Sequence, residues 1–113
     1  MNLAPATGQS LDAVPVRELM PGFHGRFLHS AAMTFVYWDI EEGAALPRHS
    51  HPHEQVVNML EGEFELTVDG TPHRLKPGDV LAIPGDAPHS GRALTRCRIL
   101  DVFHPIREDY RFA

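Results

Sequence analysis

Proline and glycine divide this chain into segments that are too short for ordinary α-helices. Ten prolines and nine glycines are distributed over 113 residues. Proline removes a helix hydrogen bond and glycine favours turns, whereas an average helix needs about 11 uninterrupted residues. We therefore predict short strands joined by turns, with almost no α-helix.

The segments between these breaks are rich in β-branched and aromatic residues, which is typical of β-strands. In residues 63–68 charged and apolar side chains alternate, and Asp69-Gly70 then gives a strong hairpin signal before residues 71–75 resume in extended form. Many short strands separated by turn signals favour an all-β jelly-roll barrel. Strands are predicted at residues 33–40, 55–60, 63–68, 80–83 and 97–103.

Length and charge limit the class of protein. The chain has the usual length of one domain and a formal net charge of −5, with no cluster of lysine and arginine. We therefore expect a small-molecule partner and neither a nucleic acid nor a membrane. No apolar stretch approaches the roughly 20 residues of a membrane span or follows the plan of a signal peptide, and the single cysteine, Cys97, excludes an internal disulfide. We expect a cytoplasmic protein with one domain over residues 1–113, in which residues 1–20 form an N-terminal arm or a partly disordered lead-in.

The segment HSHPHEQ places three histidines within five positions. Neutral imidazole is the commonest protein ligand for a divalent metal, and residues at i and i+2 of an extended strand lie on one face. His49, His51 and Gln55 share this parity, and His89 follows another strand and a proline-containing turn. A metal site built from these four residues is one interpretation, and a solvated histidine-rich loop is the other. His53 lies at the strand entrance and is not expected to be a ligand.

Two patterns of glycine and histidine include this segment and a second one further along the chain. Their spacing resembles the two sequence motifs of the cupin family, and the resemblance covers residues 33–103. It implies a double-stranded β-helix, which is a jelly-roll barrel. The two patterns are Gly43-x5-His49-x-His51-x3-Gln55-x6-Gly62 and Gly78-x5-Pro84-x4-His89.

The chain departs from the cupin motifs at three positions. Asp86 stands where the second motif has a glycine, and Ala93 stands where that motif ends in asparagine. Gln55 replaces the usual glutamate of the first motif. Because a neutral amide cancels no positive charge, Gln55 and three imidazoles would leave the full charge of a dication available as a Lewis acid.

The strand predicted at residues 97–103 carries an aspartate on an apolar face. Asp101 shares its parity with Ile99 and Phe103, so its side chain is expected to point inward. A buried carboxylate is costly unless it is paired or used. Asp101 is therefore either a structural hydrogen-bond acceptor or a catalytic acid/base.

Arg107 follows Pro105 at the expected rim of the barrel. Its guanidinium offers a planar fork that fits a carboxylate. Arg107 could therefore clamp the carboxylate of a substrate, and the alternative is a surface ion pair with Glu108 or Asp109.

The entrance HSHPHEQ, the turn PGDAPH and the C-terminal pattern DVFxPxRxDY together resemble the KdgF type of small cupin, which takes part in pectin and alginate degradation. The resemblance covers nearly the whole chain after Met20. It implies a homodimeric enzyme that converts 4,5-unsaturated monouronates, the products of polysaccharide lyases, into their linear ketone form. It also implies one divalent ion per chain, which could be zinc, nickel, manganese or iron. The implied roles are metal ligands at His49, His51, Gln55 and His89, acid/base catalysis at Asp101, and substrate contacts at Phe103 and at Arg107, which would also take part in catalysis.

Two other functions are compatible with the same barrel. An iron-dependent dioxygenase would need open coordination positions for oxygen. A non-catalytic cupin would only bind a small molecule. Dependence on oxygen distinguishes the dioxygenase from a uronate-converting enzyme.

Overall fold

The computed structural model describes residues 1–3 and 6–112, and this part of the chain is almost entirely β-structure. It contains ten strands and two 3₁₀ turns, η1 (Leu11–Ala13) and η2 (Glu108–Tyr110), and no α-helix. Residues 4 and 5 of the expected N-terminal lead-in lie outside the described residues, as does residue 113. No helix in the described part has the length and hydropathy needed to cross a membrane.

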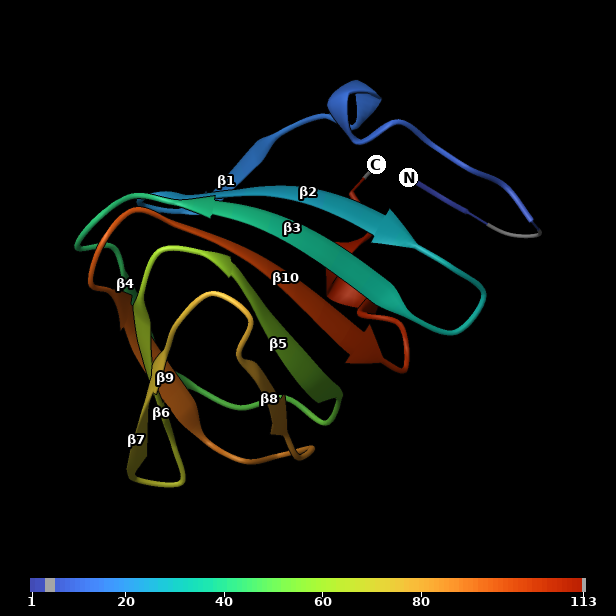
Figure 1. Cartoon of the computed structure of the whole chain (residues 1–113). Coiled ribbons are helices and arrows are strands. Elements are labelled where there is room, and N and C mark those ends of the chain that lie inside the picture. The colour runs from blue at the N-terminus through green and yellow to red at the C-terminus, as the bar shows by residue number, and fades with distance from the viewer. Residues whose placement is uncertain (4–5, 113) are drawn as a thin grey trace.

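The strands form two antiparallel sheets that face each other, as Figure 1 shows. The six-stranded sheet has the order β1-β2-β3-β10-β5-β8, and the four-stranded sheet has the order β4-β9-β6-β7. The prediction of an all-β cupin barrel is confirmed. The strands are β1 (Arg17–Met20), β2 (Phe23–His29), β3 (Thr34–Ile40), β4 (Ala45–His49), β5 (Glu54–Glu61), β6 (Phe64–Val68), β7 (Thr71–Leu75), β8 (Val80–Ile83), β9 (His89–Ala93) and β10 (Cys97–His104).

Each predicted strand is present, with ends that differ by at most one residue. The predicted hairpin joins β6 to β7, and φ is 49° at Asp69 and 79° at Gly70. Two consecutive positive φ angles are what a type I′ turn requires, and this turn matches the right-handed twist of the strands it joins.

The strands β1, β2, β4 and β9 are not among those predicted. Their own sequences are weak strand formers, because β2 contains Gly25, β4 contains Pro47 and β9 reads HSGRA. Hydrogen bonding to neighbouring strands stabilises them instead, since β2 pairs along its whole length with β3 and β9 lies between β4 and β6. Gly25 is also required by packing, because a Cβ there would lie 2.7 Å from the Trp38 ring.

Part of the N-terminal segment pairs with β2 of its own chain. The strand β1 is antiparallel to β2, and the backbone groups of Met1 and Leu3 exchange hydrogen bonds with His29. These contacts extend the edge of the six-stranded sheet.

The apolar core lies between the sheets and follows the alternation of the strands. In β10 the odd positions from Cys97 to Phe103 are buried, and the even positions are exposed or half-buried. The inward direction predicted for Asp101 is therefore confirmed. In β3 the even positions are buried in the same way, and they place Val36, Trp38 and Ile40 inside the barrel.

A substitution at Gly62, which ends the first motif, tests how closely this turn packs against the backbone of Arg96. Its φ is +78°, and a Cβ at this position would lie 2.1 Å from the carbonyl oxygen of Arg96. Gly62→Ala is expected to lower the free energy of unfolding by about 3 kcal/mol, because it adds a clash to the strain of a left-handed backbone. Gly70→Ala is the control, because φ is +79° there and nothing lies within 4 Å. Its expected cost is only about 1 kcal/mol, and equal losses in urea denaturation would contradict the clash.

Candidate metal centre

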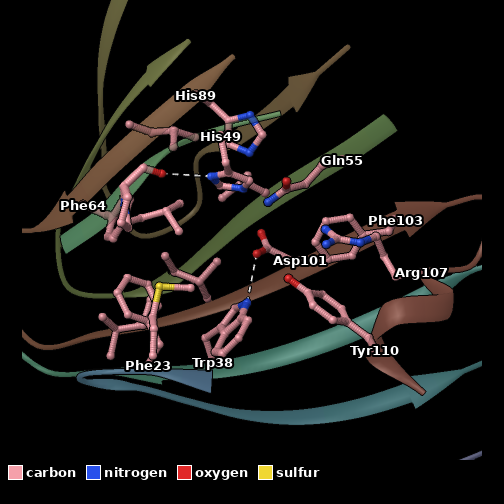
Figure 2. Close-up of a pocket in the computed structure, with 17 residues that line it drawn as sticks. Phe23, Trp38, His49, Gln55, Phe64, His89, Asp101, Phe103, Arg107 and Tyr110 are labelled. Atoms are coloured by element: carbon pink, nitrogen blue, oxygen red, sulfur yellow. Dashed lines mark hydrogen bonds between the residues drawn. The ribbon is translucent and has the colours of Figure 1, made fainter. Parts of the chain in front are cut away.

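A cavity of about 280 Å³ opens between the two sheets, and every predicted site residue except His51 lines it. Figure 2 shows the side chains that line it, with apolar and aromatic groups at one end and polar groups at the other. The volume suits one small molecule. The polar lining residues are His49, Gln55, His89, Asp101, Arg107 and Tyr110.

The fold brings His49, His51 and His89 together from separate segments. His49 ends β4 and lies opposite His89, the first residue of β9, while His51 follows in the loop before β5. The register of β4 shifts between Leu46 and His49, and such irregularities often redirect a side chain beside a functional site. Nitrogen atoms of the three imidazoles all lie within 4.8 Å of one another.

The turn of the second motif supports the loop of the first. The backbone N–H of Asp86 donates to the carbonyl of His51 at 2.8 Å. Asp86 has φ +66°, in the left-handed region that the glycine of the usual motif enters easily. Aspartate is one of the few other residues that adopt this conformation, so the departure from the motif leaves the turn intact.

Each of the three imidazoles uses Nδ1 to hold its orientation. The partners are backbone carbonyls, namely that of Pro47 for His49 at 3.0 Å, that of His53 for His51 at 3.1 Å, and that of Ala87 for His89 at 2.9 Å. A carbonyl only accepts, so Nδ1 carries the proton in each ring and Nε2 keeps a free lone pair. This is the arrangement found for histidine ligands of metals.

The free lone pairs of His51 and His89 have no satisfactory protein partner among the described residues. The Nε2 of His89 is buried and has no hydrogen-bond partner among the described residues. The Nε2 of His51 lies 3.1 Å from Oε1 of Gln55, so two electron-rich atoms face each other. Two donors that each lie about 2.0–2.2 Å from one ion are separated by about this distance.

Burial keeps the imidazoles of His51 and His89 neutral, as metal binding requires. It lowers the pKa of His51 to about 4, and the positive Arg107 and the neighbouring His89 act in the same direction. Burial also lowers the pKa of His89. The group formed by His49, His51 and His89 could therefore hold a metal ion.

His53 lies outside this group. Its ring centre lies 5.7 Å from that of His51, but its Nε2 donates to the carbonyl of Ile106 at 3.2 Å and is therefore directed at the C-terminal turn.

Asp101 is buried on β10 beside the histidines, and Figure 2 shows the Gln55 amide between them. Its Oδ2 accepts a hydrogen bond from the indole N–H of Trp38 at 3.0 Å. Its Oδ1 has no hydrogen-bond partner in the part of the chain that the structure describes. Burial raises the pKa of Asp101 to about 6, against the opposing effects of Gln55, Trp38 and Arg107. One oxygen of this carboxyl group is thus anchored by Trp38, and the other is buried beside the Gln55 amide, which stabilises its charged form.

Arg107 is buried, with 7% of its surface exposed, and does not lie on the surface as the ion-pair alternative expected. Its Nε and Nη2 bind both oxygens of Asp109, at 3.0 and 2.7 Å. The guanidinium carbon lies 4.9 Å from the ring centre of Phe103 and 4.0 Å from that of Tyr110. Arg107 therefore lines the cavity with one edge of its fork already occupied.

Tyr110 and Trp38 are two further cavity residues for which the sequence alone predicted no role. Both line the cavity, and Figure 2 shows the hydroxyl of Tyr110 directed towards it. Burial raises the pKa of Tyr110 to about 12, so the hydroxyl keeps its proton and can donate. The alternation of β3 predicts an inward Trp38, but no sequence signal pairs it with Asp101.

Comparison with known proteins places this site in a family. Residues 36–103 match the cupin domain family. Dimethylsulfoniopropionate lyase DddQ of Ruegeria pomeroyi is 34% identical over 76 residues, which span 66% of this chain and only 37% of that protein. An RmlC-like cupin from Shewanella frigidimarina is 28% identical, with a TM-score of 0.86 and coverage of 91% and 94% of the two chains. KdgF from Halomonas sp. is also 28% identical, with a TM-score of 0.83 and coverage of 88% and 95%. The chain therefore belongs to the cupin family and is similar in structure to KdgF.

Proposed function

We propose that this protein is a metal-dependent small cupin that converts 4,5-unsaturated monouronates into their linear ketone form. The observation that carries the proposal is the Asp101 carboxyl group, which has one free oxygen in the same cavity as the histidine cluster. The similarity to KdgF over most of both chains supports the substrate class. We also propose that the protein acts as a homodimer, which light scattering of the purified protein would test.

The proposed cofactor is one divalent ion, zinc, nickel, manganese or iron, bound by His49, His51, Gln55 and His89. When bound, the ion would supply positive charge that stabilises negative charge developing on a substrate oxygen. Gln55 is a suitable fourth ligand because its Oε1 already lies 3.1 Å from Nε2 of His51.

The reaction needs one acid/base group. An unsaturated uronate is a cyclic enol ether with a hemiacetal at C1. The C1 hydroxyl loses its proton as the bond between C1 and the ring oxygen breaks, C5 becomes a carbonyl, and C4 gains a proton. The free Oδ1 of Asp101 is the proposed proton carrier, and a pKa of about 6 makes both of its protonation states accessible near neutral pH.

The wall formed by Phe103, Arg107 and Tyr110 is proposed to bind the sugar acid. The Phe103 ring offers an apolar face for the sugar ring, and Tyr110 offers a hydroxyl. Asp109 occupies Nε and Nη2 of Arg107, so the remaining nitrogen, Nη1, is the proposed donor to the substrate carboxylate.

The proposal is tested by following the alkene absorbance of unsaturated galacturonate with protein of known metal content. We expect the absorbance to disappear without oxygen uptake, and removal of the metal by a chelator should abolish the reaction. Oxygen uptake would instead support a dioxygenase, and binding without turnover would support a non-catalytic cupin. Dimethylsulfoniopropionate should be assayed in parallel, because preferential cleavage of it would favour the chemistry of the DddQ relative.

Arg107→Lys is expected to raise KM by about tenfold and to leave the metal content unchanged. Lysine keeps the charge but loses the planar fork that Asp109 orients and the stacking on Phe103. Arg96→Lys is a matched control, because Arg96 binds Asp39 through the same two nitrogens at 3.0 and 2.7 Å but lies outside the cavity. If both variants had the KM of the wild type, Arg107 would not bind the substrate.

A further inference from the structure

Two polar side chains are almost fully buried behind the cavity wall without lining the cavity. His29 ends β2 and Thr34 begins β3, and the two residues lie opposite each other in the strand pair. Their exposed fractions are 3% and 0%. Buried polar groups of this kind are stable only when their hydrogen bonds are satisfied.

The directions of their hydrogen bonds follow from chemistry. The Nε2 of His29 lies 3.1 Å from the carbonyl oxygen of Tyr110, so this nitrogen carries a proton and donates. Burial keeps the imidazole neutral by lowering the pKa of His29. Its Nδ1 then accepts from the hydroxyl of Thr34 at 2.8 Å. The hydroxyl oxygen of Thr34 in turn accepts the backbone N–H of Arg107 at 2.9 Å.

This chain of bonds begins and ends on one short turn. Arg107 and Tyr110 are the residues that flank and end η2, and both line the cavity. The turn is closed by the N–H of Tyr110, which donates to the carbonyl of Arg107 at 3.0 Å. It follows β10, where strand pairing has ended, so Thr34 and His29 connect it to the barrel.

We propose that Thr34 and His29 are positioning residues that fix the backbone at Arg107 and Tyr110 and so set the wall that binds the ligand. This inference rests on the proposed function, in which that wall binds the carboxylate of a sugar acid. Neither residue contacts the cavity, so their effect on binding passes through the turn.

Thr34→Val removes the hydroxyl and keeps the branched shape, whereas Thr34→Ser keeps the hydroxyl and removes the methyl group. Thr95→Val is the matched control, because the Thr95 hydroxyl also accepts a backbone N–H, that of Glu63 at 3.0 Å, and neither of these two residues lines the cavity. Hydrogen exchange of the Arg107 amide, measured by NMR without substrate, reports the bond directly. The values of kcat and KM for unsaturated galacturonate report its consequence.

In Thr34→Val we expect Arg107 amide exchange to accelerate at least about tenfold more than exchange of the core amides. KM should rise roughly fivefold or more with kcat little changed, because substrate binding is lost and not chemistry. Thr34→Ser should resemble the wild type in both measurements. Thr95→Val should accelerate exchange at Glu63 and leave Arg107 and KM unchanged.

Two outcomes would overturn the inference. Exchange at Arg107 that rises only in proportion to exchange of the core amides would show that Thr34 contributes stability alone. A selectively freed Arg107 amide with an unchanged KM would show that the turn does not set the binding wall. Failure of the wild-type protein to convert any uronate would contradict the proposed function and not the positioning role of Thr34. The two failures can be distinguished because the exchange measurement needs no substrate.

Discussion

Replacing His51 by alanine is expected to lower the bound metal to below about a tenth of an ion per chain. Loss of one of the four proposed ligands should weaken metal binding by at least about 100-fold, since even residues that only support a ligand account for 10- to 100-fold. The fold should persist, because the backbone bond from Asp86 to the carbonyl of His51 does not involve the imidazole. Elemental analysis after dialysis measures the loss directly. Added metal should raise the melting temperature of the wild type and not that of the variant.

His53→Ala is the matched control for this experiment. His53 belongs to the same HSHPHEQ segment, but its ring donates to the carbonyl of Ile106 and lies outside the histidine group. The variant should therefore keep its metal. Full metal content in His51→Ala, or equal loss in both variants, would contradict the proposed ligand set and favour a solvated histidine-rich loop.

The residues of the candidate metal centre were predictable from their spacing in the sequence, and the proline-containing turn predicts that His89 arrives from another segment. Parity along one strand is not what brings the others together, because His49 ends β4, His51 lies in the following loop and Gln55 belongs to β5. What the sequence could not show is how each ring is held. The carbonyls that accept from Nδ1 belong to residues two positions away, and only the three-dimensional path of these loops aims all three Nε2 atoms inward.

The fold was predictable where a strand carries its own signal. Alternation in residues 63–68 and the Asp69-Gly70 turn specify the β6–β7 hairpin without help from the rest of the chain. The strands β4 and β9 carry no such signal, and they become strands because β9 pairs on both sides. Pairing partners that are distant in sequence decide such strands, which is why local propensity misses them.

The C-terminal pattern DVFxPxRxDY predicted a functional Arg107, but most of the contacts that define its place in the structure are tertiary. Its backbone is fixed by Thr34, 73 positions earlier in the chain, and its guanidinium packs on Phe103. The pairing with Asp109 is an exception, because it is local and was one of two ion pairs considered from the sequence. The sequence could not show that the guanidinium of this pair is buried in the cavity wall while its partner Asp109 stays exposed.

Asp101→Asn is expected to lower turnover of an unsaturated uronate by about two orders of magnitude or more, with metal content near that of the wild type. Asparagine is nearly isosteric, and its carbonyl oxygen can still accept the indole N–H of Trp38. The free oxygen becomes an amide nitrogen that does not exchange protons. A positioned acid/base group typically contributes about 10²–10⁴-fold, so its removal accounts for the expected loss.

Asp39→Asn is the matched control, because it makes the same chemical change on the neighbouring strand. Asp39 lies beside β10 but faces away from the cavity and pairs with Arg96. Its variant should turn over substrate at the rate of the wild type. Normal turnover in a folded Asp101→Asn protein would remove Asp101 from the mechanism and leave the metal as the remaining candidate catalyst.

The stability of the metal-free proteins separates a functional Asp101 from a structural one. The pKa of Asp101 is raised to about 6 in the folded state from an ordinary value of 3.8. The folded protein therefore binds this proton more tightly than the unfolded chain, so the contribution of Asp101 to stability is most favourable below pH 3.8 and falls as pH rises to about 6. Ionising Asp101 inside the barrel thus costs about 3 kcal/mol at neutral pH.

The Asp101→Asn variant does not pay this cost, because it has no carboxyl group at this position. Its unfolding free energy relative to that of the wild type should therefore increase by a similar amount between pH 4 and pH 7. A structural carboxylate would give the opposite result, with the variant less stable at neutral pH. A residue that destabilises the barrel at neutral pH and yet supports turnover is one whose place in the fold is explained by chemistry and not by packing.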